Sequence, residues 1–423
     1  METPVQRRQW KRLTAVKLTV RAQAVLLLTV LAACTPGGDP AEEPTYDSAL
    51  TPYVAFLSQP HAAPVDYILG LFDDHDLVIV CERFHGETTQ WDLLFDLVSD
   101  DRFTSRVGHV FTELGVSNLQ PALDELMGTP ALEDHELNRS LLDIYRGLSF
   151  HTIWAKSNFF DFLSRVYRLN QGLEPDKRVA IHFSDMPFEW QGMTAERYAA
   201  FQATLGERDQ VMARQVIDGF RALELSDDPR KKALVVMNFR HAFNDFIDGS
   251  GRRTDNVGRY LFEAFPGRLA NVMLNSVALL PGTTDAGAVA APAQEGRWDA
   301  AFAVVGDPET AFDFAGSPFG DDDFDYHFRY SGVTYADVFD GFIFYKPLRE
   351  HRHHYTVPGI FDDAFLAEYP RRLAAAGRGV KTAEEMREYA AELEARRAVP
   401  YNDLEGLQAP IDNWLKPTSQ TGE

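Results

Sequence analysis

Cysteine and positive charge are both scarce in this chain of 423 residues. Two cysteines are too few for a disulfide scaffold or for a zinc site of four thiolates. The 41 Lys and Arg residues are outnumbered by 63 Asp and Glu residues, which gives a formal net charge of −22. Nucleic-acid binding needs a clustered positive surface that neutralises phosphates, so we expect no nucleic-acid partner.

Two common hydrolase motifs are also missing. The sequence has no Gly-x-Ser-x-Gly stretch, which argues against a serine nucleophile on a strand–helix turn. It has no His-Glu-x-x-His stretch, which places two zinc ligands on one helix of many metalloproteases. A hydrolase built from this chain would therefore activate water with other groups.

The N-terminal region resembles an export signal. Residues 1–33 hold six basic residues and one acid, so the rest of the chain carries a net charge of −27. The largely apolar run 22–33 is too short to span a bilayer but suits a signal-peptide core. It ends in Leu31-Ala32-Ala33-Cys34, which resembles a bacterial lipobox. That resemblance implies cleavage before Cys34 and its acylation by lipid, including palmitate.

The lipobox resemblance also implies a location. Residues 34–49 are rich in Pro, Gly and acidic residues, and we expect a flexible tether there. Thr35, rather than Asp, follows the lipid-attachment cysteine, which suggests the outer membrane. We therefore expect a lipoprotein of the cell envelope, anchored through Cys34 and facing the periplasm.

The body of the chain alternates short apolar runs with helical patterns. Trp91, Leu94, Phe95 and Val98 have the spacing of an amphipathic helix, which Thr88 or Thr89 could cap. Strand–helix alternation with near-continuous apolar strands predicts an α/β fold, a mostly parallel sheet flanked by helices. The expected strands are Leu77–Cys81, His109–Glu113, Arg178–Phe183, Ala233–Met237, Leu269–Val277 and Gly341–Tyr345.

Several other segments are given simpler interpretations. Residues 50–360 are expected to form the α/β domain, and 361–423 a C-terminal helical cap and tail. We expect loops at 281–298 and, as a solvated acidic segment, at 321–330. The histidine-rich stretch 351–354 is interpreted as a surface loop, because adjacent histidines suit few tetrahedral metal sites. Cys81 is interpreted as a small buried strand residue.

Polar groups collect at the expected strand ends. In open parallel sheets, ligands bind beyond the carboxyl ends of the strands. Four of the six strands deliver an acid, an imidazole or an amide to that edge. These groups are Glu82 and His85 after the first strand, Glu113 at the end of the second, Asp185 after the third, and Asn238 and His241 after the fourth.

The same residues resemble known motifs. The stretch 78–86 (VIVCERFHG) resembles the first motif of the erythromycin esterase-like proteins and of the ChaN-like haem-binding lipoproteins, in which a strand ends in Gly-Glu-x-x-His. Further matches follow in order, and the resemblance covers about residues 50–350. They are 111–114 (FTEL), 208–213 (RDQVMA), 235–241 (VVMNFRH) and 339–344 (FDGFIF).

Chemistry assigns roles that the resemblance also implies. His85 is the natural base, because imidazole titrates near neutrality, and Glu82 or Glu113 would orient it. His241 could polarise the electrophile or protonate the leaving group, and Arg208 could hold an oxyanion or a substrate carboxylate. Asp185, Asp209 and Asn238 would support them. The expected activity is hydrolysis of an ester or lactone, a small-molecule substrate, without a cofactor.

Two alternatives stay open on the sequence alone. Two histidines with carboxylates could bind a divalent metal, as in the distantly similar TraB/TIKI-type hydrolases. The ChaN-like resemblance instead implies a haem- or iron-binding lipoprotein, in which an imidazole such as that of His85 faces haem.

Overall fold

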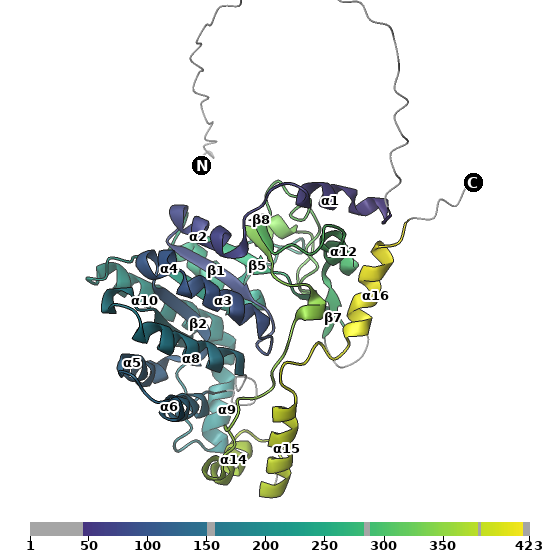
Figure 1. The fold of residues 1–423 in the computed structure, drawn as a ribbon. Coiled ribbons are helices and arrows are strands. Elements are labelled where there is room, and N and C mark those ends of the chain that lie inside the picture. Colours follow the sequence, from purple (N-terminus) through teal and green to yellow (C-terminus); the bar gives the residue numbers. More distant parts are fainter. Residues whose placement is uncertain (1–44, 150–156, 283–287, 380–381, 418–423) are drawn as a thin grey trace, which may run out of the picture. The chain divides into compact units, whose positions relative to one another are not determined.

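The computed structural model of the chain describes residues 45–149, 157–282, 288–379 and 382–417 (Figure 1). The expected signal peptide, the lipid-attachment residue Cys34 and most of the expected tether lie outside these residues. The described residues belong to one compact unit, which includes the C-terminal helices. No helix among the described residues is both long and apolar enough to span a bilayer.

Seven strands form one sheet in the order β3-β2-β4-β1-β5-β9-β8. All neighbours run parallel except β8, which lies antiparallel to β9 at the edge, so the prediction of a mostly parallel sheet is confirmed. The strands are β1 (Leu77–Glu82), β2 (His109–Val116), β3 (Ala180–Asp185), β4 (Ala233–Asn238), β5 (Leu269–Leu274), β8 (Thr310–Asp313) and β9 (Gly341–Phe344).

Both faces of the sheet are buried, because successive side chains of a strand point to opposite sides. In β1, Val78 and Val80 join one core, whereas Leu77, Ile79 and Cys81 join the other. Helices that pack in the first core are α2 (Pro64–Asp74), α3 (Thr89–Ser99), α4 (Asp101–Arg106), α5 (Gln120–Gly128), α6 (Asp134–Arg146), α8 (Ser157–Gln171), α9 (Ala195–Thr204), α14 (Asp363–Ala375) and α15 (Ala383–Ala395).

The second core holds the other α-helices of the described residues, among them the C-terminal one. They are α1 (Thr51–Leu57), α10 (Arg208–Leu225), α11 (Val257–Ala264), α12 (Arg297–Val304), α13 (Tyr335–Val338) and α16 (Leu404–Trp414). Figure 1 shows α3 and α8 over one side of the sheet and α12 and α16 grouped near β7. The prediction of a C-terminal helical extension is confirmed.

The connections reverse direction between β2 and β4. The chain leaves β2 towards β3 through α5, α6 and α8, which pack in the first core, and leaves β4 towards β5 through α11, which packs in the second. Such a reversal opens a crevice at the carboxyl ends of two adjacent strands, where ligands bind in open α/β sheets. The fold therefore directs attention to the ends of β2 and β4.

Some sequence predictions were wrong at the level of single elements. The expected strand Leu269–Val277 is two strands, β5 and β6 (Val277–Pro281), because Asn275 leaves the sheet and bonds to Arg83 and Tyr345. The expected loop 281–298 contains β7 (Ala288–Pro292), which pairs antiparallel with β6, and the start of α12. Strand β8 was not predicted.

Two expected surface loops are partly buried. In the histidine-rich stretch, His351 and His353 are buried beneath the C-terminal segment, so the surface interpretation was wrong for them. In the acidic stretch, Asp322 accepts hydrogen bonds from Tyr53 and Trp298, and Asp325 accepts one from Tyr335. These acids join secondary-structure elements instead of facing solvent together. Cys81 is buried on β1, as predicted.

Candidate active site

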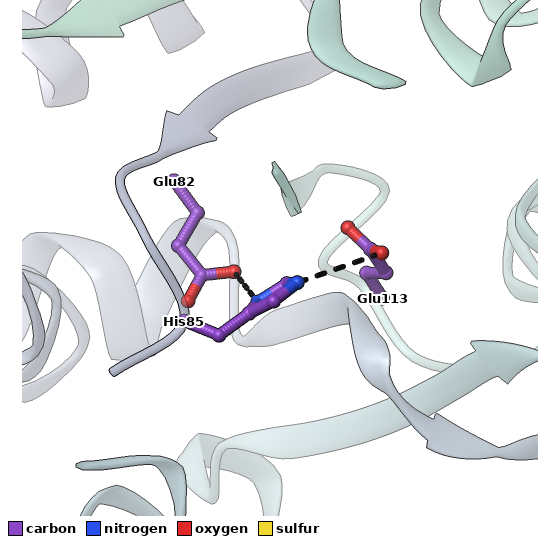
Figure 2. Close-up of side chains that lie close together, drawn as sticks. All are labelled: Glu82, His85 and Glu113. Atoms are coloured by element: carbon purple, nitrogen blue, oxygen red, sulfur yellow. Dashed lines mark hydrogen bonds and ion pairs between the residues drawn. The ribbon is translucent and has the colours of Figure 1, made fainter. Parts of the chain in front are cut away.

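Glu82 and His85 form a close pair at the end of β1. The imidazole Nδ1 lies 3.1 Å from Oε2 of Glu82, and the other nitrogen, Nε2, lies 3.9 Å from Oε1 of Glu113 (Figure 2). Glu82 is 1% exposed, whereas the His85 side chain retains 16% of its exposure. The carboxylate is thus buried behind an imidazole that solvent can still reach.

The electrostatics of this pair favour a protonated imidazole. Burial lowers the pKa of His85, but the negative charge and hydrogen bond of Glu82 and the charge of Glu113 outweigh it, so the pKa is raised above 6.5. Burial raises the pKa of Glu82, and the nearby His85 only partly opposes that rise. In its ionised form, Glu82 stabilises the imidazolium that forms when His85 takes up a proton.

Glu113 is the central carboxylate of the cluster. Its Oε2 accepts a hydrogen bond of 2.9 Å from the backbone N–H of Asn238, across the β2–β4 junction. Its Oε1 accepts one of 3.0 Å from Nη2 of Arg208. Burial would raise the pKa of Glu113, but His241, Arg208 and His85, together with the Asn238 N–H, lower it to about 2. Glu113 is therefore a fixed negative charge at neutral pH.

Local backbone geometry lets Glu113 reach that position. β2 continues to Val116, three residues past the expected end, and its register against β3 shifts between Thr112 and Val116. Gly115 has φ +122°, and a Cβ there would lie 2.1 Å from the ring of Phe183. Only glycine fits this irregular turn of the strand.

Arg208, at the start of α10, joins β2 to β3. Its Nε donates to Asp185 at 2.8 Å and its Nη2 donates to Glu113, so one guanidinium binds both carboxylates. These two charges outweigh burial and raise its pKa. The cation is held in one orientation, with Nη1 3.5 Å from Nε2 of His241.

His241 belongs to a second acid–imidazole pair. Its Nδ1 is hydrogen-bonded to Asp209, the second residue of α10, and Arg240 pairs with the other oxygen of that carboxylate at 2.7 Å. Burial would raise the pKa of Asp209, but His241 and Arg240 lower it. The Nε2 of His241 lies 3.6 Å from Oε1 of Glu113.

The turn that carries His241 is attached to the end of β1. The amide of Asn238 donates to the backbone carbonyls of Glu82 and Arg83. The next residue, Phe239, has φ +41°, an unusual conformation for a bulky side chain and one that concentrates at functional sites. Its ring contacts those of Phe84 and Tyr326. The two histidine-bearing loops therefore form one unit.

All eight residues expected in the site come together in the structure. They are joined by the contacts given above: Glu82, His85, Glu113, Asp185, Arg208, Asp209, Asn238 and His241. Sequence reasoning missed Arg83 and Glu87, which lie two residues to either side of His85 and form a buried ion pair at 3.0 Å. The spacing of two charged residues around a strand-end histidine is a signal that could have identified them.

A divalent metal fits this cluster poorly. Glu82, His85 and Glu113 each offer a ligand atom within 4.8 Å of the others. However, the Glu113 oxygen nearest to His85 already binds the Arg208 guanidinium, and that positive charge opposes a cation at the same place. We therefore do not assign these residues as metal ligands.

Comparisons with known proteins find similarity in structure only. No protein-family model matches the sequence, and no curated protein matches it. Solved structures that resemble the chain include an erythromycin esterase, the EreC mutant in its open conformation, at 12% identity and a TM-score of 0.41. That match covers 71% of this chain and 96% of the other.

Two further solved structures have similar scores. A protein from Bacillus cereus is 10% identical, with a TM-score of 0.42 over 69% of this chain and 96% of its own. A succinoglycan biosynthesis protein is 10% identical, with a TM-score of 0.40 over 69% of this chain and 92% of its own. Similarity at this level says nothing about the reaction. One of the three structures, the erythromycin esterase, comes from the family that the sequence motifs resemble.

Proposed function

We propose that the chain is a hydrolase that cleaves an ester or lactone with water activated by His85. The observation that carries the proposal is the Glu82–His85 pair, with Nδ1 bonded to a buried carboxylate and Nε2 directed to a second one. A base oriented by a buried acid is the arrangement that proton transfer from a nucleophile requires. The ordered sequence motifs support the same reaction class.

The reaction would proceed in two steps. Water adds to the carbonyl carbon while its proton moves to Nε2 of His85, and Glu82 stabilises the imidazolium. The carbon–oxygen bond to the alcohol then breaks, and the departing oxygen takes up a proton. The products are a carboxylic acid and an alcohol, or a hydroxy acid from a lactone, so no further reactant is needed.

Arg208 and His241 would act on the developing negative charges. The guanidinium is already fixed by Asp185 and Glu113, and a fixed cation stabilises an oxyanion without reorganising. His241 is oriented by Asp209 through Nδ1, which leaves Nε2 directed into the cluster, where it can polarise the carbonyl or protonate the alcohol. The base and the acid of the reaction are thus each an imidazole paired with its own carboxylate: His85 with Glu82, and His241 with Asp209.

A panel of aryl esters, alkyl esters and lactones tests this proposal. We expect the wild-type protein to hydrolyse at least one class, with one ¹⁸O atom from labelled water in the acid product after a single turnover. A haem titration in parallel tests the carrier alternative. The haem-binding alternative would be favoured over the hydrolase if the wild-type protein gave a Soret band, lost in His85→Ala, and hydrolysed no member of the panel.

We also propose that the protein is lipid-anchored through Cys34 at the outer membrane and faces the periplasm. The support is the sequence of the export signal and the lipobox. Palmitate labelling of cells that express the full chain should mark the wild-type protein and not a Cys34→Ser variant. A Cys34→Ser protein that is still recovered with membranes would contradict the anchor.

A further inference from the structure

A buried arginine, Arg83, anchors the loop that follows β1. Arg83 is fully buried, and its guanidinium donates to Glu87 at 3.0 Å and to Thr89 at 3.1 Å. It also donates to the carbonyl and side-chain oxygens of Asn275, both at 2.6 Å, and to the carbonyl of Tyr345 at 2.5 Å. A buried cation with this many partners holds its backbone in one place.

Glu87 completes the attachment on the other side of His85. It is fully buried, and its two oxygens accept hydrogen bonds from the backbone N–H groups of Thr89 and Gln90, which begin α3. Thr88 stands at the position where a threonine cap was predicted but makes no side-chain capping bond, so Glu87 caps the helix instead. Burial would raise the pKa of Glu87, but Arg83, His351 and these bonds outweigh it and lower the pKa to about 2.

A distant segment of the chain closes over the same loop. Residues 352–354 bond to it through the backbone, from Thr88 N–H to the carbonyl of Arg352 at 2.7 Å and from His354 N–H to the carbonyl of Gly86 at 2.8 Å. The N–H of Arg352 also donates to Glu87 at 3.3 Å. His353 in turn pairs with Val399 through two backbone hydrogen bonds.

We propose that Arg83, Glu87 and residues 352–354 form a brace that positions His85 against Glu82. These groups act on the loop that carries the imidazole and not on the expected reacting atoms, so they are positioning residues. His85 is held on both sides along the chain, and the short span between Arg83 and Glu87 leaves its imidazole little freedom to turn away. The proposal rests on the proposed function only in calling that orientation productive.

The test is a spectroscopic one that needs no substrate. ¹⁵N-histidine NMR of the full chain gives the tautomer and the pKa of each imidazole, with the His85 signal identified by its loss in His85→Gln. The brace variants are Glu87→Gln and Arg83→Met/Glu87→Gln, of which the second leaves no unpaired buried charge. The matched control is Arg230→Met/Asp228→Asn, because Arg230 is also buried and donates to an acid and two backbone carbonyls at the other edge of the sheet.

In a folded brace variant, we expect His85 to lose its bond to Glu82 and its pKa to fall towards the ordinary value near 6.5. The protonated fraction of His85 above that pH then falls, whereas the control pair leaves it unchanged. If the charge-altering variants are unfolded, Thr89→Val, which removes one hydroxyl between Arg83 and Glu87, should give the same direction of change.

An unchanged pKa and tautomer of His85 in a folded brace variant would overturn the brace, and so would an equal change in the control pair. The two proposals fail separately. If the His85 signal shifts in the brace variant but the wild-type protein hydrolyses nothing, the brace proposal stands and the hydrolase proposal fails. If the wild-type protein hydrolyses a substrate but the signal does not shift in the brace variant, the hydrolase proposal stands and the brace proposal fails.

Discussion

The imidazoles of His85 and His241 direct their Nε2 atoms at the same atom, Oε1 of Glu113, from 3.9 and 3.6 Å. They come from different loops, and each is bonded through Nδ1 to its own acid, Glu82 or Asp209. The result is two acid–imidazole pairs around one carboxylate. Hydrolysis needs a base and an acid at one carbonyl group, and this arrangement supplies one imidazole for each.

The first prediction concerns Glu82→Gln and the pH dependence of hydrolysis. Only neutral His85 accepts a proton from water, so activity should rise with pH through the raised pKa of His85, above 6.5. Glu82→Gln removes the charge that raises this pKa. We expect the rising limb to move to lower pH, while the plateau rate falls roughly 10-fold to 1000-fold because the imidazolium loses its partner. The pH profile of kcat/KM measures both effects.

A matched control for this variant is Glu125→Gln, an equal change on the exposed face of α5. In this control, the rising limb of the kcat/KM profile should lie at the same pH as in the wild type. If the rising limb of Glu82→Gln also lies at the wild-type pH, another group governs the pH dependence.

The second prediction concerns the stability of Glu113→Gln. The substitution leaves Arg208 buried with only Asp185 as a charged partner and removes the charged acceptor of the Asn238 N–H. We expect the free energy of unfolding to fall by roughly 3 kcal/mol at neutral pH, the order found when one member of a buried pair is removed. Urea unfolding measures it, and Glu125→Gln should stay within about 0.5 kcal/mol of the wild type. A loss that small in Glu113→Gln would contradict the central place of Glu113.

The third prediction concerns acid denaturation. The pKa of Glu113 is lowered from 4.5 to about 2, so its stabilisation is present above pH 4.5 and lost as the pH falls towards 2. The pKa of His351 is lowered from 6.5 to about 3, mainly by burial and then by Arg83. His351 therefore stays neutral in the folded state, whereas the unfolded chain takes up a proton below pH 6.5. Both groups make stability fall on acidification.

Unfolding free energies measured from about pH 7 to about pH 2.5 test this sum. The part due to Glu113 is about 3 kcal/mol, because folding lowers its pKa from 4.5 to about 2. Glu113→Gln should flatten the curve below pH 4.5. A Glu113→Gln curve parallel to that of the wild type in the acid range would show that the carboxyl is not held ionised.

The fourth prediction concerns metal. Because Arg208 occupies the Glu113 oxygen nearest to His85, elemental analysis should find well under one divalent metal per chain. Hydrolysis should survive dialysis against EDTA. One equivalent of zinc or manganese per chain, with activity lost to the chelator and restored by that metal, would favour a metal-dependent hydrolase instead.

Sequence reasoning reached the strand ends because parallel strands bring their carboxyl ends to one edge. Glu82, Glu113 and Asn238 follow from that rule alone, and the apolar runs of β1 and β4 define where the edge lies. The bond from Arg208 to Asp185 was out of reach, because it depends on how α10 approaches β3 in space. The sequence also could not predict in which direction the chain leaves β2 and β4, and this direction places the site between those strands.

The largest error concerned the burial of the histidine-rich stretch. Residues 351–354 were interpreted as a surface loop because adjacent histidines suit few tetrahedral metal sites. His351 and His353 are covered because Arg83 and Glu87 neutralise each other beneath them and because the segment pairs with Val399, far along the chain. Two opposite charges four residues apart look the same in a sequence whether their ion pair is buried or exposed.

The most direct test of the account compares hydrolysis by the wild type with that by His85→Asn, across the ester and lactone panel at mildly alkaline pH. The substituted asparagine keeps a polar side chain of similar reach but cannot accept the proton from water. The account predicts a loss of roughly 100-fold to 10,000-fold in kcat/KM, in a variant that urea unfolding shows to be folded under the assay conditions. Turnover equal to that of the wild type in a folded His85→Asn protein would contradict the assignment of His85 as the base.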